Sequence, residues 1–230
     1  MISIIIPTLN EEKYLGSLLR FLQYHADRSK YEVIVVDGGS EDQTPQIAKS
    51  FQIVRFYQSN QTSRAHQMNQ GAKVAKVDIL YFVHADVKLV ESFVDDISKE
   101  INSGTESGCY RYRFTKPHHP LLHINGFFTR FPFSWCRGGD QTLFISKDRF
   151  EQLGGFDESF VIMEDYEFLD RLSKAGICFK VIPRSIEVSA RKYLNNSYWK
   201  VQMINLKAMS MYKRGVSPDA IRSFYRTELN

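Results

Sequence analysis

The sequence contains little cysteine, with three residues among 230: Cys109, Cys136 and Cys178. Because this number is odd and no two have metal-ligand spacing, we expect ordinary thiols in a reducing cytoplasm rather than a disulfide framework. Long hydrophobic runs are also missing. The longest, such as residues 2–6, have strand length and fall far short of the roughly 20 residues of a membrane helix. The N-terminus, MISIIIPTLNEE, lacks the basic start and long apolar segment of a secretory signal.

These absences predict a soluble, cytoplasmic chain that is at most peripheral to the inner face of a membrane. A strong charge imbalance is absent as well. Lys and Arg number 30 against 26 Asp and Glu, and the net charge of +4 is too small to indicate nucleic acid as the main partner. Hydrophobic residues make up 43% of the chain and charged residues 24%, which is ordinary for one folded domain.

Two phosphate-binding motifs are missing from the sequence. No G-x-G-x-x-G follows a predicted strand, and no G-x-x-x-x-G-K-[ST] occurs. The glycine pairs at 38–39, 138–139 and 154–155 indicate tight backbone but match neither motif. Redox chemistry with a dinucleotide and P-loop hydrolysis are therefore disfavoured.

Short apolar runs alternate with helical patterns in the first half of the chain. We expect buried strands at residues 3–6, 33–36, 53–57 and 79–83. Between them, helices are predicted at residues 11–26 and 63–75 and from Thr44 onward. Continuous apolar strands that alternate with helices predict an α/β fold, with a mostly parallel central sheet covered by helices on both faces.

The second half is less regular. Helices are predicted at residues 91–102, 164–175, 196–213 and 218–228. Strands are predicted at residues 109–114, 141–146 and 177–182. The stretch 116–135, rich in His, Pro and aromatic residues, is expected to be an excursion outside the main sheet. Without repeats or linkers, we expect one domain, 1–230, that consists of a first half (1–104), a second half (105–192) and a helical tail (193–230).

Three predicted strands end in abruptly polar segments, at residues 7–11, 37–40 and 84–86. Ligands of open parallel sheets bind at the carboxyl ends of the strands. Ordinary turns and helix caps, however, also place polar residues directly after a strand. Asp86 is a natural ligand for Mg²⁺ or Mn²⁺, with diphosphate oxygens completing the shell. His84 lies two residues earlier and is a second ligand, a hydrogen-bond donor to phosphate, or a histidine that merely packs.

An acidic pair, Glu164-Asp165, opens a predicted helix. Acids are favoured in the first turn by the helix dipole, so a purely structural role is a serious alternative. The functional interpretation is a general base that faces the strand ends and removes the proton from an acceptor hydroxyl.

Together these segments resemble the family 2 glycosyltransferases, which have the GT-A fold. The resemblance covers about residues 2–190 and rests on SIIIPTLNEE at 3–12, VIVVDGGSEDQT at 33–44, GGFDE at 154–158 and MEDYEF at 163–168. SRAHQMNQGA at 63–72, HAD at 84–86 and GGDQ at 138–141 are similar to a small soluble bacterial branch of that family.

The resemblance implies that residues 1–104 form the nucleotide-sugar-binding half and residues 105–192 the acceptor and catalytic half, and it implies a set of residue roles. A nucleotide-diphosphate sugar, UDP-linked in most of the family, would contact Pro7, Thr8, Leu9, Glu11, Asp37, Gly38, Arg64, Gln67, His84 and Ala85. Among these, Asp37 would bind the base, and Arg64 with Gln67 would reach the nucleotide or its phosphates. Asp86 would be the metal ligand, and Asp165 the catalytic base beside Glu164. Asp140 and Gln141 would contact the acceptor or the donor sugar.

The sequence departs from the family at one position, because the usual Asp-x-Asp motif begins here with His84. The change weakens the expected metal site or shifts its preference toward a metal that tolerates imidazole. The expected reaction is an inverting single displacement, with the metal on Asp86 stabilising the leaving diphosphate. The basic pair Arg191-Lys192 either adds to this stabilisation or is a plain solvated charge pair. A non-catalytic nucleotide-sugar-binding domain and a sugar nucleotidyltransferase are the competing interpretations.

The tail leaves three possibilities open. One helical stripe contains Tyr198, Trp199, Met203, Leu206 and Met209, and Lys and Arg lie elsewhere on the segment. Such a stripe packs against the domain, forms a homodimer, or lies on a membrane surface near a lipid-linked acceptor.

Overall fold

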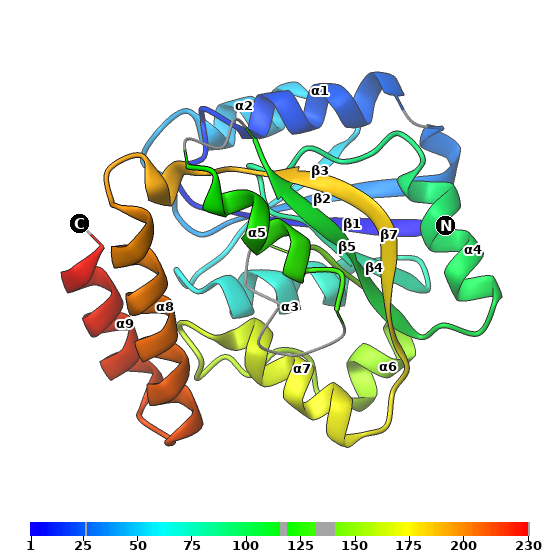
Figure 1. Cartoon of the computed structure of the whole chain (residues 1–230). Helices are drawn as coiled ribbons and strands as arrows, with labels where there is room; N and C mark the ends of the chain where they lie inside the picture. The colour runs from blue at the N-terminus through cyan, green and yellow to red at the C-terminus, as the bar shows by residue number, and fades with distance from the viewer. Residues whose placement is uncertain (26, 116–118, 132–140, 230) are drawn as a thin grey trace.

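The computed structural model describes residues 1–25, 27–115, 119–131 and 141–229. Within these residues, seven strands form one sheet in the order β3-β2-β1-β4-β6-β5-β7 (Figure 1). The strands are β1 Ile2–Thr8, β2 Tyr31–Asp37, β3 Val54–Gln58, β4 Ile79–Phe82, β5 Ser107–Phe114, β6 Leu143–Ser146 and β7 Phe179–Val188.

Most strand pairs in the sheet are parallel, as the sequence predicts. β1 pairs in parallel with β2 and β4, β2 with β3, and β5 with β7. β6 is the exception, since it runs antiparallel to both of its neighbours, β4 and β5. Ile5 shows why the strands are apolar throughout: it pairs with Ile34 on one side and Phe82 on the other, in the middle of the sheet.

Helices cover both faces of this sheet, as predicted. They are α1 Leu15–His25, α2 Thr44–Ser50, α3 Arg64–Val74, α4 Phe93–Asn102, α5 Leu121–Phe128, α6 Lys147–Gln152, α7 Glu164–Lys174, α8 Tyr198–Lys213 and α9 Pro218–Glu228. Helices α1, α2 and α4 lie on one face, and α3, α6 and α7 on the other (Figure 1). The two cores follow the strand alternation, because Ile4 packs with the first group and Ile5 with the second.

Helix α3 brings polar residues to the carboxyl ends of β1 and β2. Ser63 caps its start by accepting a hydrogen bond from the backbone N–H of His66. Gly71 lets the helix approach the sheet closely, because a Cβ at this position would overlap the side chain of Ile5. This close packing fixes the first turn of α3, with Arg64 and Gln67, beside the strand ends.

The predicted excursion between β5 and β6 contains helix α5, which lies outside the sheet. Residues 116–118 and 132–135 of that stretch lie outside the described residues. Helix α6, which the sequence patterns did not predict, follows β6 directly and buries Phe150. Strand β7 continues to Val188, six residues beyond the predicted end of the strand at 182.

The C-terminal helices pack on the domain through a different face than the sequence stripe predicts. Val201, Ile204 and Ala208 are the buried residues of α8. By contrast, Trp199 and Met203 of the stripe are 65% and 69% exposed. The α8–α9 pair rests on the segment before α7, where Met163, Ala208 and Ile221 form a small buried cluster. Across the described ranges, no helix has both the length and the apolar character needed to span a bilayer.

Candidate functional site

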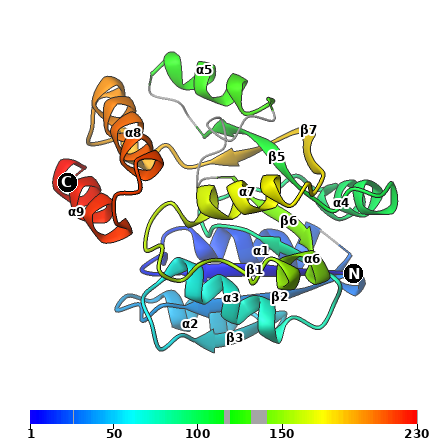
Figure 2. The same cartoon turned by 90° about the horizontal axis from the view of Figure 1, so that it is seen from below.

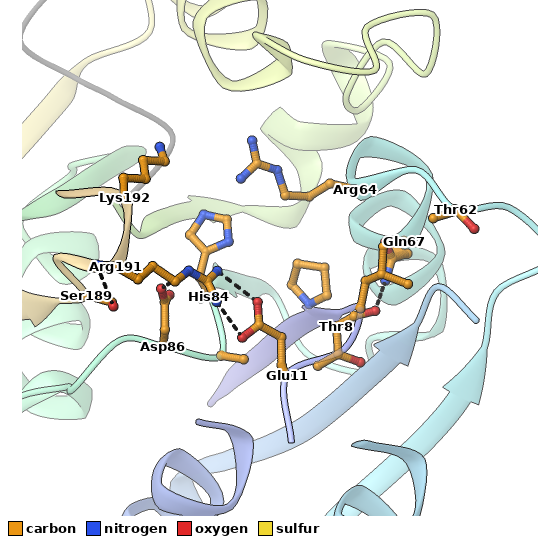
Figure 3. A pocket seen from close by; sticks show the side chains of 13 residues that line it. Thr8, Glu11, Thr62, Arg64, Gln67, His84, Asp86, Ser189, Arg191 and Lys192 are labelled. Carbon is orange, nitrogen blue, oxygen red and sulfur yellow. Dashed lines mark hydrogen bonds and ion pairs between the residues drawn. The ribbon is translucent and has the colours of Figure 1, made fainter. Parts of the chain in front are cut away.

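The carboxyl ends of β1 and β4 open into a pocket of about 290 Å³. Figure 3 shows the side chains around it. The lining residues are Pro7, Thr8, Leu9, Glu11, Thr62, Arg64, Gln67, His84, Ala85, Asp86, Ser189, Arg191 and Lys192. The structure therefore brings together nine of the predicted nucleotide-sugar and metal positions, and adds a wall from the segment that follows β7.

Asp37 lies just behind this pocket and is fully buried. Its carboxylate accepts hydrogen bonds from the Thr8 hydroxyl at 3.1 Å, from the backbone N–H groups of Gly39 and Ser40 at 3.0 and 2.9 Å, and from the Ser40 hydroxyl. These bonds hold the turn after β2 against the end of β1. The predicted contact of Asp37 with a base stays a prediction, and its observed contacts shape the pocket floor.

Gln67 is also buried, and its amide clamps the two neighbouring strand ends. Its Nε2 donates to the carbonyls of Thr8 at 2.8 Å and Val36 at 2.7 Å. Gly38 lies against the same amide, and a Cβ at that position would be 3.0 Å from its oxygen. A residue larger than glycine at this position would press on the Gln67 amide and shift it from the strand ends by a few tenths of an ångström.

Arg191, from the segment that follows β7, joins that segment to the ends of β1 and β4. Its guanidinium donates two hydrogen bonds of 2.9 Å to the Glu11 carboxylate, and its Nε lies 3.3 Å from Asp86 Oδ2 (Figure 3). Burial alone would lower the pKa of Arg191, but the hydrogen bonds to Glu11 and the charge of Asp86 outweigh it and raise the pKa above its ordinary value. The permanent positive charge of Arg191 therefore lies next to Asp86, the predicted metal ligand.

The donor atoms around Asp86 fit a divalent cation only if a substrate supplies most of the ligands. Among the described residues, no group of three or more His, Cys, Asp or Glu side chains is placed to hold a metal ion. Asp86 is one carboxylate, 16% exposed, and His84 lines the same pocket. Mg²⁺ and Mn²⁺ are commonly held by one or two carboxylates together with substrate phosphates, so a single carboxylate at Asp86 is compatible with such a site.

On the other side of the pocket, Arg64 lies against the acidic pair that opens α7. Its Nε donates a hydrogen bond to Glu164 Oε1, and its Nη2 lies 3.4 Å from Asp165 Oδ2. Met163 makes this possible, since its left-handed backbone (φ 68°) turns the chain sharply into the helix. Glu164 is 1% exposed, whereas the side chain of Asp165 is 20% exposed. Of the two acids, Asp165 is therefore the one that faces a cavity.

That cavity is a second pocket, of about 470 Å³, which adjoins the first. Arg64 and Lys192 line both pockets. The other lining residues of the second are Tyr112, Phe114, Asn125, Phe128, Ile162, Met163, Asp165, Tyr166, Tyr193, Gln202, Asn205, Leu206, Ala208, Met209 and Tyr225. Eight of the 17 residues that line the second pocket come from α5, α8 and α9, whose residues were not among the predicted site residues. In the sequence, this wall corresponds to aromatic and amide side chains on the tail. They can be recognised as part of a binding site only when the positions of the helices are known.

The two remaining predicted site residues lie apart from these pockets or outside the described chain. Gln141 lines a small cavity of about 20 Å³ that Asp165 also lines. Asp140 falls outside the described residues.

Replacing Arg64 by Met is expected to lower the free energy of unfolding by about 3 kcal/mol, because the buried Glu164 carboxylate loses its counter-charge. Urea denaturation measures this change. The second substitution Glu164→Leu, made in the same chain, should restore most of the loss. Arg149→Met is the matched control, since its partner Glu106 is 32% exposed and such surface pairs contribute about 1 kcal/mol or less. Equal losses in the two single variants would contradict this account of Glu164.

Comparison with known proteins decides the family. A family model described as glycosyl transferase family 2 matches residues 3–149. The chain belongs to this family. The match covers the first pocket up to Asp86 and ends before the acidic pair at Glu164, so the second pocket lies mostly beyond it.

Curated relatives in the family include two with informative names. A dolichyl N-acetyl-alpha-D-glucosaminyl phosphate 3-beta-D-2,3-diacetamido-2,3-dideoxy-beta-D-glucuronosyltransferase from Methanococcus voltae is 33% identical over 36% of this chain and 29% of its own length. Poly(ribitol-phosphate) beta-N-acetylglucosaminyltransferase TarS from Staphylococcus aureus is 26% identical over 74% of this chain and 33% of its own. The chain therefore spans about a third of the length of these relatives.

Solved structures share the fold. S. aureus TarS 1-349 in complex with UDP-GlcNAc matches with a TM-score of 0.70 at 17% identity, over 100% of this chain and 71% of that one. Mannosyltransferase PcManGT from Pyrobaculum calidifontis, in complex with GDP-Man and Mn²⁺, matches with a TM-score of 0.67 at 16% identity, over 99% and 68%. The predicted family 2 membership and GT-A fold are confirmed.

Proposed function

We propose that this chain is a glycosyltransferase that moves a sugar from a nucleoside diphosphate sugar to an acceptor hydroxyl, with inversion at the anomeric carbon. The observation that carries the proposal is the pair of adjoining pockets. Asp86 lines the first, Asp165 lines the second, and Arg64 and Lys192 line both. A donor in the first pocket and an acceptor in the second would meet where these two cations lie.

The reaction follows from these positions. Asp165 accepts the proton of the acceptor hydroxyl, and the hydroxyl oxygen forms a bond to the anomeric carbon as the bond to the diphosphate oxygen breaks. The nucleoside diphosphate leaves with the electron pair of that bond. A single displacement from the face opposite the leaving group inverts the configuration. Glu164 acts as a positioning residue, because it is buried beneath Arg64 and lines neither main pocket.

Charge on the leaving diphosphate would be stabilised by cations of the chain. Arg64, Arg191 and Lys192 line the first pocket, and fixed positive groups lower the barrier where negative charge develops. Asp86, with His84 beside it, would hold a divalent ion, Mn²⁺ or Mg²⁺, which when bound neutralises part of the diphosphate charge. The Mn²⁺ in the PcManGT complex supports this cofactor.

Uracil is the proposed base of the donor, and the TarS complex with UDP-GlcNAc supports it. The complex of PcManGT with GDP-Man makes guanine the alternative. We propose that the nucleotide base lies on the pocket floor formed by Thr8, Asp37 and Gln67. Hydrogen bonds among these residues hold the ends of β1 and β2 in place there.

Incubation with a panel of UDP- and GDP-sugars, with Mn²⁺ present, tests the proposal. We expect release of the nucleoside diphosphate, at first by slow transfer to water and faster once an acceptor is supplied. Release of pyrophosphate would instead identify a nucleotidyltransferase. Binding of a nucleotide sugar with neither product, even in the presence of acceptor extracts, would identify a non-catalytic binding domain.

A further inference from the structure

Exposed apolar side chains gather on one part of the surface. Ten large hydrophobic residues are exposed in the described part of the chain, and seven of them lie on or beside α5 and α8. We call these seven the apolar rim: Ile124, Phe127, Phe128, Leu194, Trp199, Met203 and Leu206. The two helices are joined by a 2.9 Å hydrogen bond from the Tyr198 hydroxyl to Asn125, and Figure 2 shows them at the same edge of the molecule. Such a concentration of exposed apolar groups marks a binding surface.

The rim continues into the second pocket. Phe128 of α5 and Leu206 of α8 line that pocket and are also 40% and 71% exposed. Behind them the lining contains the aromatic residues Tyr112, Phe114, Tyr166, Tyr193 and Tyr225, and Asp165 belongs to the same wall. The pocket thus joins an apolar surface to the proposed base. A molecule with a hydroxyl at Asp165 and an apolar body across Phe128 and Leu206 would fit this lining.

The segments that carry the rim are basic. Residues 188–218 contain six Lys and Arg and no Asp or Glu, with Arg191 among them paired to Glu11 and Asp86, and residues 119–131 contain Arg130 and no acid. A net charge of +4 for the chain, less +6 for 188–218, leaves −2 for the rest. On α8, Lys200 and Lys207 are exposed and lie within one residue of Trp199 and Leu206. Apolar residues flanked by lysines are the pattern of a surface that binds anionic lipid.

We propose that the apolar rim and its lysines dock on an anionic lipid surface, and that the acceptor is an amphipathic alcohol held in that surface. The acceptor part rests on the proposed function, whereas the docking part does not. A second copy of the chain is the other candidate occupant of the rim. The charge argues against it, because two copies would bring two strongly basic segments together.

Co-sedimentation with vesicles tests the docking. We expect the full chain to bind phosphatidylcholine–phosphatidylglycerol vesicles but not pure phosphatidylcholine, with binding weakened by salt. The double variant Trp199→Ser/Met203→Ser, outside both main pockets, should lower the partition coefficient by about tenfold or more. Tyr24→Ser on α1, where the side chain is 72% exposed, is the matched control and should bind like the unmodified chain.

The contribution of positive charge to vesicle binding is tested separately from the contribution of apolar contact. Lys200→Gln/Lys207→Gln should weaken vesicle binding by about fivefold for each lysine removed. Lys174→Gln/Lys180→Gln removes the same charge from exposed positions away from the rim and should have little effect. Equal losses in both pairs, or no binding to anionic vesicles, would overturn the docking. A concentration-dependent dimer in light scattering that Trp199→Ser/Met203→Ser abolishes would assign the rim to a second copy instead.

The acceptor class has its own test in the nucleoside diphosphate release assay. With the donor chosen from the panel, 1-decanol in anionic vesicles should accelerate release, whereas glycerol, a hydroxyl compound without an apolar body, should not. Equal acceleration by both, or by neither, would overturn the amphipathic acceptor. If the panel yields no nucleoside diphosphate while the chain still binds vesicles, the proposed function fails and the docking surface stands.

Discussion

Replacing Asp165 by Asn is expected to lower the rate of sugar transfer by about three orders of magnitude, the middle of the range for a lost general base. Asparagine keeps the shape of the side chain but cannot accept the proton of the acceptor hydroxyl. Nucleotide affinity should stay within about twofold of the unmodified value, because Asp165 lines the second pocket and not the first. The rate is measured as release of nucleoside diphosphate, and the affinity by isothermal titration calorimetry.

Asp170→Asn is the matched control for this substitution. Asp170 lies on the same helix, α7, and accepts a 2.8 Å hydrogen bond from the Tyr212 hydroxyl, outside both main pockets. Its transfer rate should equal that of the unmodified chain. If Asp165→Asn retained a rate within about tenfold of the unmodified chain, a loss smaller than general bases show, Asp165 could not be the base.

Replacing Asp86 by Asn is expected to remove the part of nucleoside diphosphate affinity that depends on metal, a loss of about a hundredfold in the presence of Mn²⁺. The amide is a poor ligand for a hard cation. Arg191 should stay in place, because its two hydrogen bonds to Glu11 remain. The measurement is titration with UDP in Mn²⁺ and again in EDTA.

Two further variants make this result specific. Asp78→Asn changes an exposed aspartate just before the start of β4, at the end of the strand away from Asp86, and should leave the metal dependence intact. His84→Gln reports whether the imidazole is a ligand, since a partial loss of metal dependence is expected if it is. Identical titrations with Mn²⁺ and EDTA in the unmodified chain would show that Asp86 serves only as the partner of Arg191.

The parts of the fold that depend on local pattern were predictable. The apolar runs at 3–6 and 33–36 lie within β1 and β2, because a buried parallel strand needs an uninterrupted apolar sequence. Strand β7 was predicted too short, since the polar and proline-containing residues 183–185 hide its second half. The antiparallel direction of β6 could not be predicted, because it depends on pairing with β4 and β5 rather than on its own four residues.

The candidate site was predictable where it is made of strand ends. Asp37, Asp86 and the turn after β1 follow apolar runs, and parallel strands bring such ends together. The contact between Arg191 and Glu11 joins residues 180 positions apart, and no local pattern encodes it. Trp199 and Met203 form a regular helical stripe, yet they are exposed because α8 buries the face with Val201. Periodicity finds an apolar face but does not say which of two faces meets the core.

The contact between Arg191 and Glu11 also bears on when the site forms during synthesis. Glu11 emerges from the ribosome early, but its partner follows 180 residues later, after the last strand of the sheet. Contacts of such high sequence separation form late, since the chain between them must first be ordered. A nascent chain that ends within the 3–149 segment can build the strand ends but lacks Ser189, Arg191 and Lys192. Nucleotide capture should therefore begin only after residues 189–192 have been translated.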